Sequence, residues 1–91
     1  MNGRMIKMVV KSKEEIFNIV KESICEIMPE LEGHEFNINE KLVDLGANSV
    51  DRADIVMTTM ETLNLDIPRV ELAGVNNLSG LVDKIFEKLN K

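Results

Sequence analysis

A chain of 91 residues has room for one domain, and its net charge of −5 argues against nucleic acid as a partner. A composition of 44 % hydrophobic and 30 % charged residues is typical of a globular protein in water, and no apolar run is long enough for a signal peptide core or a membrane span. One cysteine, Cys25, excludes an internal disulfide, and the acidic residues lack the spacing of a metal site. We therefore expect a cytoplasmic protein that binds neither nucleic acid nor membrane.

The charge is distributed unevenly along the chain. The first 13 residues carry no acid and four bases, at Arg4, Lys7, Lys11 and Lys13. Residues 14–66 carry thirteen acids and three bases, a local balance of −10, and these bases are Lys21, Lys41 and Arg52. An acidic body favours partners with basic docking patches. We interpret residues 1–12 as a basic, flexible leader and residues 13–91 as the folded domain.

The first predicted helix follows Ser12, which forms a capping-box pattern with Glu15. Pro29 ends this helix, because the residue before a proline avoids helical backbone angles. Cys25 lies close to the apolar stripe and is expected to be a small buried residue. Apolar residues in this segment recur at helical spacing, at Ile16, Ile19, Val20, Ile24, Ile27 and Met28.

Residues 29–48 form a long connection that contains several apolar residues. A connection of this length in a small domain usually has a function or a short turn of its own, and we predict one helical turn at residues 39–43. Phe36 and Leu42 are the expected buried anchors. His34, the only histidine, is expected to be a solvated loop residue, since a base or metal ligand needs convergent partner groups.

The second long helix is predicted over residues 49–64. Asn48 is a preferred N-cap, and Asp51 stands three residues later, where its carboxylate favours the free amides of the first turn. A small bundle needs only one buried apolar row on each helix. This helix has a first row at Ile55, Val56, Thr59 and Leu63, and a second row at Val50, Ala53, Met57 and Met60. The second row fits a wider buried stripe and a contact surface equally well.

The remaining elements are shorter. Asp66, Ile67 and Pro68 end the second helix, and residues 69–74 are predicted to form a short helix. Asn76 or Asn77 then caps a final helix with a stripe at Leu78, Leu81, Val82, Ile85 and Leu89, beside Phe86. No segment alternates like a strand. The predicted fold is all-α: a bundle of three long helices and one short helix, with a long loop between the first two.

Ser49 is the strongest candidate for a residue that carries a chemical function. If Asn48 is the cap, the Ser49 hydroxyl is not needed to start the helix, and a positive helix end favours a phosphate ester. Most serines at helix starts are capping residues, however. A hydrolase nucleophile is rejected, because the required glycine stands two residues before the serine, whereas Gly46 stands three before Ser49.

Several short matches give the chain a resemblance to a known family. Leu45-Gly46, Ser49-Val50-Asp51, Val56-Met57, Leu63 and Ile67-Pro68 together resemble an acyl carrier protein from about residue 13 to residue 91. The resemblance implies a four-helix fold in which a phosphopantetheinyl transferase moves 4′-phosphopantetheine from coenzyme A to Ser49. It also implies that the thiol of this arm holds acyl groups as thioesters, while the carrier itself catalyses nothing. The usual family core is Asp-Ser-Leu, whereas this chain has Asn48-Ser49-Val50, and Arg52 stands in a helix that is usually strongly acidic.

Residues 45–54 (Leu-Gly-Ala-Asn-Ser-Val-Asp-Arg-Ala-Asp) and 67–74 resemble the free-standing donor carriers of polyketide β-branching cassettes. This branch implies a malonyl group, loaded by an acyltransferase and decarboxylated to acetyl by a ketosynthase-like enzyme. An enzyme that resembles hydroxymethylglutaryl-CoA synthase then joins the acetyl carbon to a β-ketone on an acceptor carrier. Acceptors tend to have a tryptophan in the second helix, and this chain has none.

The resemblance implies that partner enzymes recognise the residues around Ser49. Arg52 is expected to be exposed, so that reversing its charge costs little stability. The expected recognition residues are Ala47, Asn48, Val50, Asp51, Arg52, Ala53, Asp54, Met57 and Arg69. Two alternatives stay open: a general fatty-acid or peptidyl carrier, and a helical interaction module without a prosthetic group, in which Ser49 only begins a helix. We expect a monomer in each case.

Overall fold

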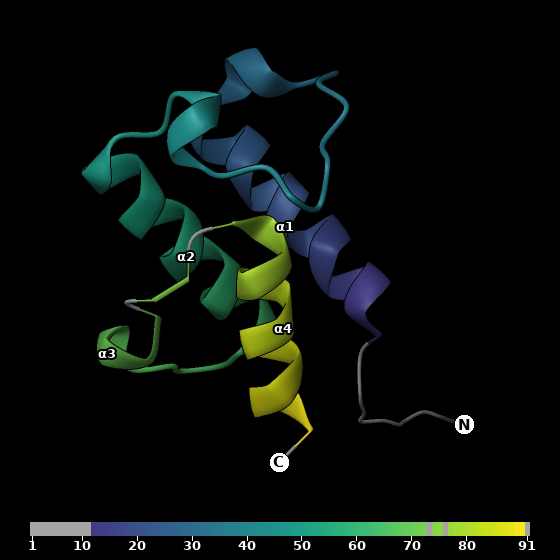
Figure 1. Cartoon of the computed structure of the whole chain (residues 1–91), viewed down its shortest axis with the longest axis vertical. Coiled ribbons are helices and arrows are strands. Elements are labelled where there is room, and N and C mark those ends of the chain that lie inside the picture. The colour runs from purple at the N-terminus through teal and green to yellow at the C-terminus, as the bar shows by residue number, and fades with distance from the viewer. Residues whose placement is uncertain (1–11, 73, 76, 91) are drawn as a thin grey trace.

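The computed structural model describes residues 12–72, 74, 75 and 77–90, and all regular structure in these ranges is helical. The long helices α1 (Lys13–Ile27), α2 (Ser49–Leu63) and α4 (Leu78–Leu89) form a bundle, and the short α3 (Arg69–Leu72) lies to one side (Figure 1). The predicted all-α class with three long helices and one short helix is confirmed. The expected leader lies outside the described residues, apart from Ser12.

Helix α1 begins as its sequence predicts. Ser12 is the N-cap: its hydroxyl accepts a hydrogen bond from the Glu15 N–H at 3.2 Å, and the Glu15 carboxylate accepts one from the Ser12 N–H at 3.0 Å. The helix ends before Pro29. The expectation that Cys25 is buried is wrong, because Cys25 is half-buried. It follows Ile24 by about 100° around the helix, which turns its side chain away from the centre of the stripe.

The core lies where α1 packs against both α2 and α4. From α2 only Ile55 and Thr59 are fully buried, and the Thr59 hydroxyl donates to the Ile55 carbonyl at 2.8 Å, so no polar group of that side chain is left unpaired. The buried apolar residues are Ile16, Val20, Ile24, Met28, Ala47, Ile55, Ile67, Leu78, Leu81, Val82 and Ile85. One buried row on α2 is therefore sufficient for the bundle.

The long connection contains two short 3-10 helices, η1 (Pro29–Leu31) and η2 (Val43–Leu45). The predicted turn at residues 39–43 is wrong in position, because η2 begins only at Val43. It ends at Gly46, whose φ of 96° suits glycine and whose N–H donates to the Val43 carbonyl at 3.1 Å. Phe36 and Leu42 pack against the edge of the core, but they are half-buried rather than buried. The buried residue of this connection is Ala47, with 2 % of its surface exposed.

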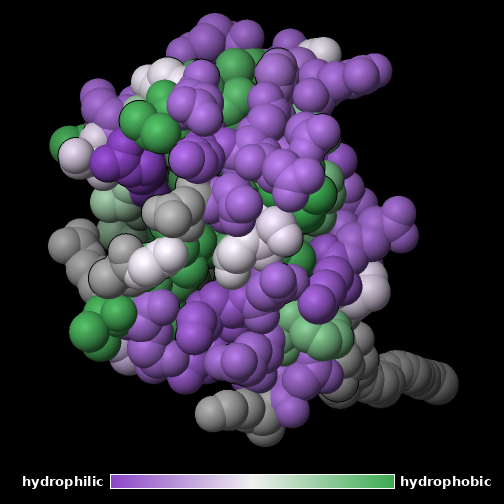
Figure 2. Space-filling view, viewed as in Figure 1, coloured by the Kyte–Doolittle hydropathy of each residue, from purple (hydrophilic) through white to green (hydrophobic). Residues whose placement is uncertain are grey.

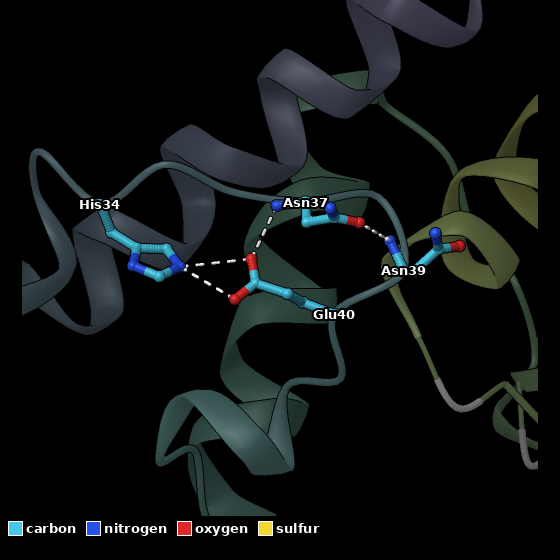
Figure 3. A network of polar contacts seen from close by, with 4 residues as sticks. All are labelled: His34, Asn37, Asn39 and Glu40. Atoms are coloured by element: carbon cyan, nitrogen blue, oxygen red, sulfur yellow. Dashed lines mark hydrogen bonds and ion pairs between the residues drawn. The ribbon is translucent and has the colours of Figure 1, made fainter.

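A polar network holds the middle of the connection in place (Figure 3). The Glu40 carboxylate accepts a hydrogen bond from the Asn37 N–H at 2.7 Å and lies 3.0 Å from Nε2 of His34. The Asn39 N–H donates to the Asn37 side-chain oxygen at 2.8 Å. His34 is exposed, as expected of a loop residue, but it is part of this network rather than surrounded by solvent alone.

The same segment holds the start of α4. The N–H groups of Leu78 and Ser79 donate to the carbonyls of Glu40 and Ile38, at 2.9 and 2.7 Å. Amides in the first turn of a helix have no acceptor within the helix, and these two obtain one from the connection. Asn77 is the N-cap of α4, and its side-chain oxygen accepts a hydrogen bond from the Gly80 N–H at 2.8 Å.

The Glu40 network predicts a pH-dependent contribution to stability. The hydrogen bond from the Asn37 N–H holds the pKa of Glu40 below its ordinary value of 4.5; desolvation opposes this, and His34 lowers the pKa further. Folding therefore favours the ionised carboxylate. Its contribution is complete above pH 4.5 and is lost as the pH falls through the lower folded-state pKa.

We expect Glu40→Gln to lower the free energy of unfolding at pH 7 and to have progressively less effect below pH 4.5, in urea titrations at a series of pH values. Glu35→Gln is the matched control, since it removes the same charge from an exposed position of the same loop. A difference between wild type and Glu40→Gln that stays constant down to pH 2 would contradict this account.

Candidate functional site

The start of α2 is arranged so that the Ser49 hydroxyl is left unused. Asn48 is the N-cap: its side-chain oxygen accepts a hydrogen bond from the Asp51 N–H at 2.8 Å, and the Asp51 carboxylate accepts one from the Asn48 N–H at 3.3 Å. Ser49 is the first residue of the helix and is exposed. Within the described ranges, its side chain has no hydrogen-bond partner. The capping role that most such serines have is taken here by Asn48.

The residues just before Ser49 anchor it to the core. Gly46 ends η2 in the left-handed conformation, and the Ala47 N–H donates to the Leu42 carbonyl at 3.1 Å. Ala47 was expected to contact partners, but only 2 % of its surface is exposed, so its side chain belongs to the core. Two residues later the chain reaches the surface, which places the Ser49 hydroxyl at a fixed point on the molecule.

Arg52 lies one helical turn after Ser49 and bridges the start of α2. Its guanidinium donates to the Ala47 carbonyl at 3.0 Å, and the residue is half-buried. The expectation of an exposed Arg52 is therefore wrong, and a substitution there also removes a hydrogen bond. In the described part of the chain Arg52 forms no ion pair with a carboxylate, although Asp51 and Asp54 are close in sequence.

The second apolar row of α2 reaches the surface. Val50 is 67 % exposed and Met57 is 51 % exposed, while Ala53 and Met60 are half-buried. Figure 2 shows hydrophobic atoms at the surface on the side where α2 and α3 lie, next to a mostly hydrophilic surface. A wider buried stripe is therefore wrong for Val50 and Met57, while a contact surface at this row stays a prediction.

The other expected recognition residues differ in how the structure places them. Asp54 is exposed on α2, and Asp51 is half-buried because it takes part in the capping box. Arg69 begins α3, but its side chain lies outside what the structure describes.

Beside this row lies a groove with a volume of about 610 Å³, which is within the usual range for pockets that hold small molecules. The sequence did not point to it, because its walls come from the connection, α2, α3 and α4. The only sequence signal was that Lys41 and Arg52 are two of the three bases in the acidic body. The residues that line the groove are Lys41, Leu42, Val43, Arg52, Ala53, Val56, Met57, Met60, Leu72, Val75, Asn77 and Leu81.

Comparison with known proteins agrees with this geometry. Residues 18–85 match the family model described as phosphopantetheine attachment site. The chain is 47 % identical over 77 residues to the polyketide biosynthesis acyl-carrier-protein AcpK of Bacillus subtilis, a match that covers 85 % of this chain and 94 % of that protein. It is 39 % identical over 46 residues to an acyl carrier protein of Guillardia theta, which covers 50 % of this chain and 57 % of that protein.

A solved structure is also similar. The crystal structure of the curacin biosynthetic pathway HMG synthase in complex with acetyl donor-ACP contains a chain that superposes with a TM-score of 0.81. The two chains are 45 % identical, and the match covers 86 % of this chain and all of that one.

The chain belongs to the phosphopantetheine attachment family and is an acyl carrier protein, a non-catalytic carrier with a covalently bound 4′-phosphopantetheine. This assignment overturns the alternative of an interaction module without a prosthetic group. Of the described helices, none is long and apolar enough to cross a membrane.

Asn48 caps α2, and this structural role can be tested without changing Ser49. Asn48→Ala should lower the free energy of unfolding by about 1 kcal/mol, because it removes the acceptor for the Asp51 N–H. Asn48→Asp, which restores the residue usual in the family, keeps a capping oxygen and should leave stability within about 0.5 kcal/mol of wild type. Urea denaturation monitored by circular dichroism measures both, and equal losses in the two variants would show that the cap does not stabilise α2.

Proposed function

We propose that Ser49 is the residue to which the 4′-phosphopantetheine arm is attached. The observation that carries this proposal is its exposed hydroxyl, left without a partner among the described residues because Asn48 caps the helix. A phosphodiester on that oxygen would lie beside the free amides and the positive end of α2, a 15-residue helix. When bound, the arm supplies a thiol that holds acyl groups as thioesters. The residues around Ser49 hold the attachment point in one place.

Attachment can be measured directly. After incubation with coenzyme A and a promiscuous phosphopantetheinyl transferase, intact-mass spectrometry should show one added arm on the wild type and none on Ser49→Ala. Ser79→Ala is the matched control, because Ser79 also lies in the first turn of a helix that an asparagine caps, as the second residue of α4 where Ser49 is the first of α2. An added mass on Ser49→Ala would place the arm on another residue.

We further propose that this carrier donates acetyl groups to an HMG-synthase-like enzyme in polyketide β-branching. Two findings support the role: the similarity to AcpK, which is named for polyketide biosynthesis, and the similarity to the acetyl donor-ACP in the curacin HMG synthase complex. The absence of tryptophan from the sequence agrees with a donor rather than an acceptor. The other proposed partners are a phosphopantetheinyl transferase, an acyltransferase and a decarboxylating ketosynthase-like enzyme, which meet a monomeric carrier in the cytoplasm.

The docking surface that we propose for these enzymes surrounds Ser49. Val50 and Met57 supply exposed apolar area, and Asp54 supplies an exposed charge beside them. Arg52 adds a positive charge in a helix that is otherwise acidic in its first two turns. Donor and acceptor carriers have the same arm, so one synthase must distinguish them by such surface groups, including groups that repel the wrong partner. The contact area should be small, because the carrier leaves after each step.

Arg52→Glu should lower kcat/KM for acetyl transfer to the synthase by about tenfold, as expected for reversing one charge at an interface. It should also lower the free energy of unfolding by about 0.5–1.5 kcal/mol, since the hydrogen bond to the Ala47 carbonyl is lost. Lys21→Glu on α1 is the control for net charge. Transfer assays with loaded wild type and variants decide the matter, and an unchanged kcat/KM for Arg52→Glu would remove Arg52 from the interface.

A further inference from the structure

The peptide group between Ala47 and Asn48 is held by two side chains of α2. Its carbonyl, which belongs to Ala47, accepts a hydrogen bond from the Arg52 guanidinium at 3.0 Å. Its N–H, which belongs to Asn48, donates to the Asp51 carboxylate at 3.3 Å. Asp51 and Arg52 are consecutive residues near the start of α2. The helix therefore fixes the orientation of the peptide that leads into it.

The Ala47 carbonyl depends on Arg52 for its hydrogen bond. Ala47 has only 2 % of its surface exposed, so water has little access to this oxygen. Among the described residues, no backbone N–H and no other side chain donates to it. Buried carbonyls almost always have a donor, because leaving one unpaired costs free energy. Without the guanidinium, the Ala47 carbonyl would have to turn toward solvent or toward another donor.

The backbone on either side of this peptide allows such a turn. Rotation of a peptide group changes ψ of the residue before it and φ of the residue after it. Asn48 has φ −83°, and asparagine is one of the residues that most readily adopt positive φ. The hydrogen bond from the Ala47 N–H to the Leu42 carbonyl belongs to the preceding peptide and does not oppose the rotation. The contacts with Asp51 and Arg52 are thus the polar restraints on the Ala47–Asn48 peptide.

The orientation of this peptide affects the place of the Ser49 hydroxyl. Asn48 is the one residue between the peptide and Ser49, and its backbone angles set the direction in which the chain enters α2. Long side chains in a helix lean toward its N-terminus, and residues three apart are neighbours. The Arg52 side chain therefore passes beside Ser49 to reach the Ala47 carbonyl. This contact joins the chain before the serine to the helix after it.

A carbonyl, and not a carboxylate, holds the Arg52 guanidinium. The residue is half-buried, and in the described part of the chain it has no ion pair. Salt screens the attraction between exposed charges on two proteins far more than it screens a partly buried contact. The response to salt can therefore separate a role of Arg52 within the carrier from a role of its charge in docking.

We propose that Arg52 is a positioning residue for attachment of the arm: by holding the Ala47 carbonyl, it keeps the Ala47–Asn48 peptide in the orientation that presents the Ser49 hydroxyl to the transferase. This role rests on the proposed attachment at Ser49, and it is separate from the docking role of the Arg52 charge.

The reaction is sensitive to the position of the serine oxygen. This oxygen forms a bond to the phosphorus of coenzyme A that carries pantetheine. The bond from that phosphorus to the bridging oxygen breaks, the adenosine bisphosphate leaves, and the serine proton passes to a base of the transferase. A reacting atom that is misplaced by about 1 Å can slow such a step by about 100-fold.

The test measures attachment in single turnovers. The apo carrier is mixed with coenzyme A and an excess of a promiscuous phosphopantetheinyl transferase, and the added mass is followed with time. The dependence of the rate on transferase concentration separates the maximum rate from the half-saturating concentration. We expect Arg52→Met to lower the maximum rate about tenfold and to change the half-saturating concentration by less than about twofold. Raising the salt concentration from about 0.05 to about 0.5 M should leave the tenfold difference in place.

Two further variants show what the Arg52 side chain contributes. Arg52→Lys keeps the charge and a donor on a flexible stem, and should recover about half of the lost maximum rate on a logarithmic scale. Lys41→Met is the matched control, because Lys41 supplies the other positive charge of the same groove and has no hydrogen bond or ion pair within the described ranges. Its maximum rate should equal that of the wild type. Circular dichroism at the assay temperature checks that each variant is folded.

A second readout follows the peptide itself. In HNCO spectra one cross-peak joins the Asn48 N–H to the Ala47 carbonyl carbon, so it reports both hydrogen bonds of this peptide. The cross-peak should move in Arg52→Met and stay close to its wild-type position in Lys41→Met. An unchanged cross-peak in Arg52→Met would show that Arg52 does not hold the peptide, and would overturn the proposal.

The kinetic results distinguish failure of this role from failure of the attachment site. A loss that lies in the half-saturating concentration and disappears at about 0.5 M salt would mean that Arg52 acts through docking alone, which overturns the positioning role. A wild type that gains no mass at Ser49 overturns the attachment site together with the positioning role. A wild type that is loaded at Ser49, with the same maximum rate as Arg52→Met, overturns the positioning role alone.

Discussion

The capping box between Asn48 and Asp51 is the interaction on which the arrangement of this protein depends. It satisfies two backbone amides at the start of α2 with two side chains. Because these residues cap the helix from either side of Ser49, the serine hydroxyl is not required for folding. The positive end of α2 then faces an exposed hydroxyl, a combination suited to a phosphodiester. In this way the same turn starts a helix and presents an attachment point.

The long connection between α1 and α2 has a second structural role. Its carbonyls at Ile38 and Glu40 accept hydrogen bonds from the first turn of α4, while Ala47, at its end, is buried in the core. The connection therefore joins the start of α2 to the start of α4, two elements far apart in sequence. Lys41 lies between these contacts, which explains how a loop residue comes to line a groove together with Arg52. The shape of the groove and the position of Ser49 depend on the same short segment.

Local patterns predicted the elements well and individual burial less well. The caps at Ser12 and Asn48 and the apolar stripes of α1 and α4 were found from sequence, because caps and periodicity depend on residues within a few positions of each other. Cys25, Phe36 and Leu42 were expected to be buried and are only half-buried. Ala47 was expected at the surface and lies in the core. Phe36, Leu42 and Ala47 lie outside the long helices and have no periodicity to indicate their direction, so their burial depends on the path of the chain. Cys25 is on α1, but it lies at the edge of the buried stripe.

The amino-acid sequence by itself determined that this chain is all-α, with helices that begin at particular capping residues and with Ser49 at the head of the second long helix. These features follow from hydrogen bonds and side-chain spacing within one or two turns, which the order of residues specifies directly. Only the tertiary structure decided that Val50 and Met57 are exposed, that Arg52 is hydrogen-bonded to Ala47, and that Lys41 and Arg52 share one groove. The physical reason is that these facts depend on how α1, α4 and the connection pack around α2, and contacts between distant segments leave no local pattern in the chain.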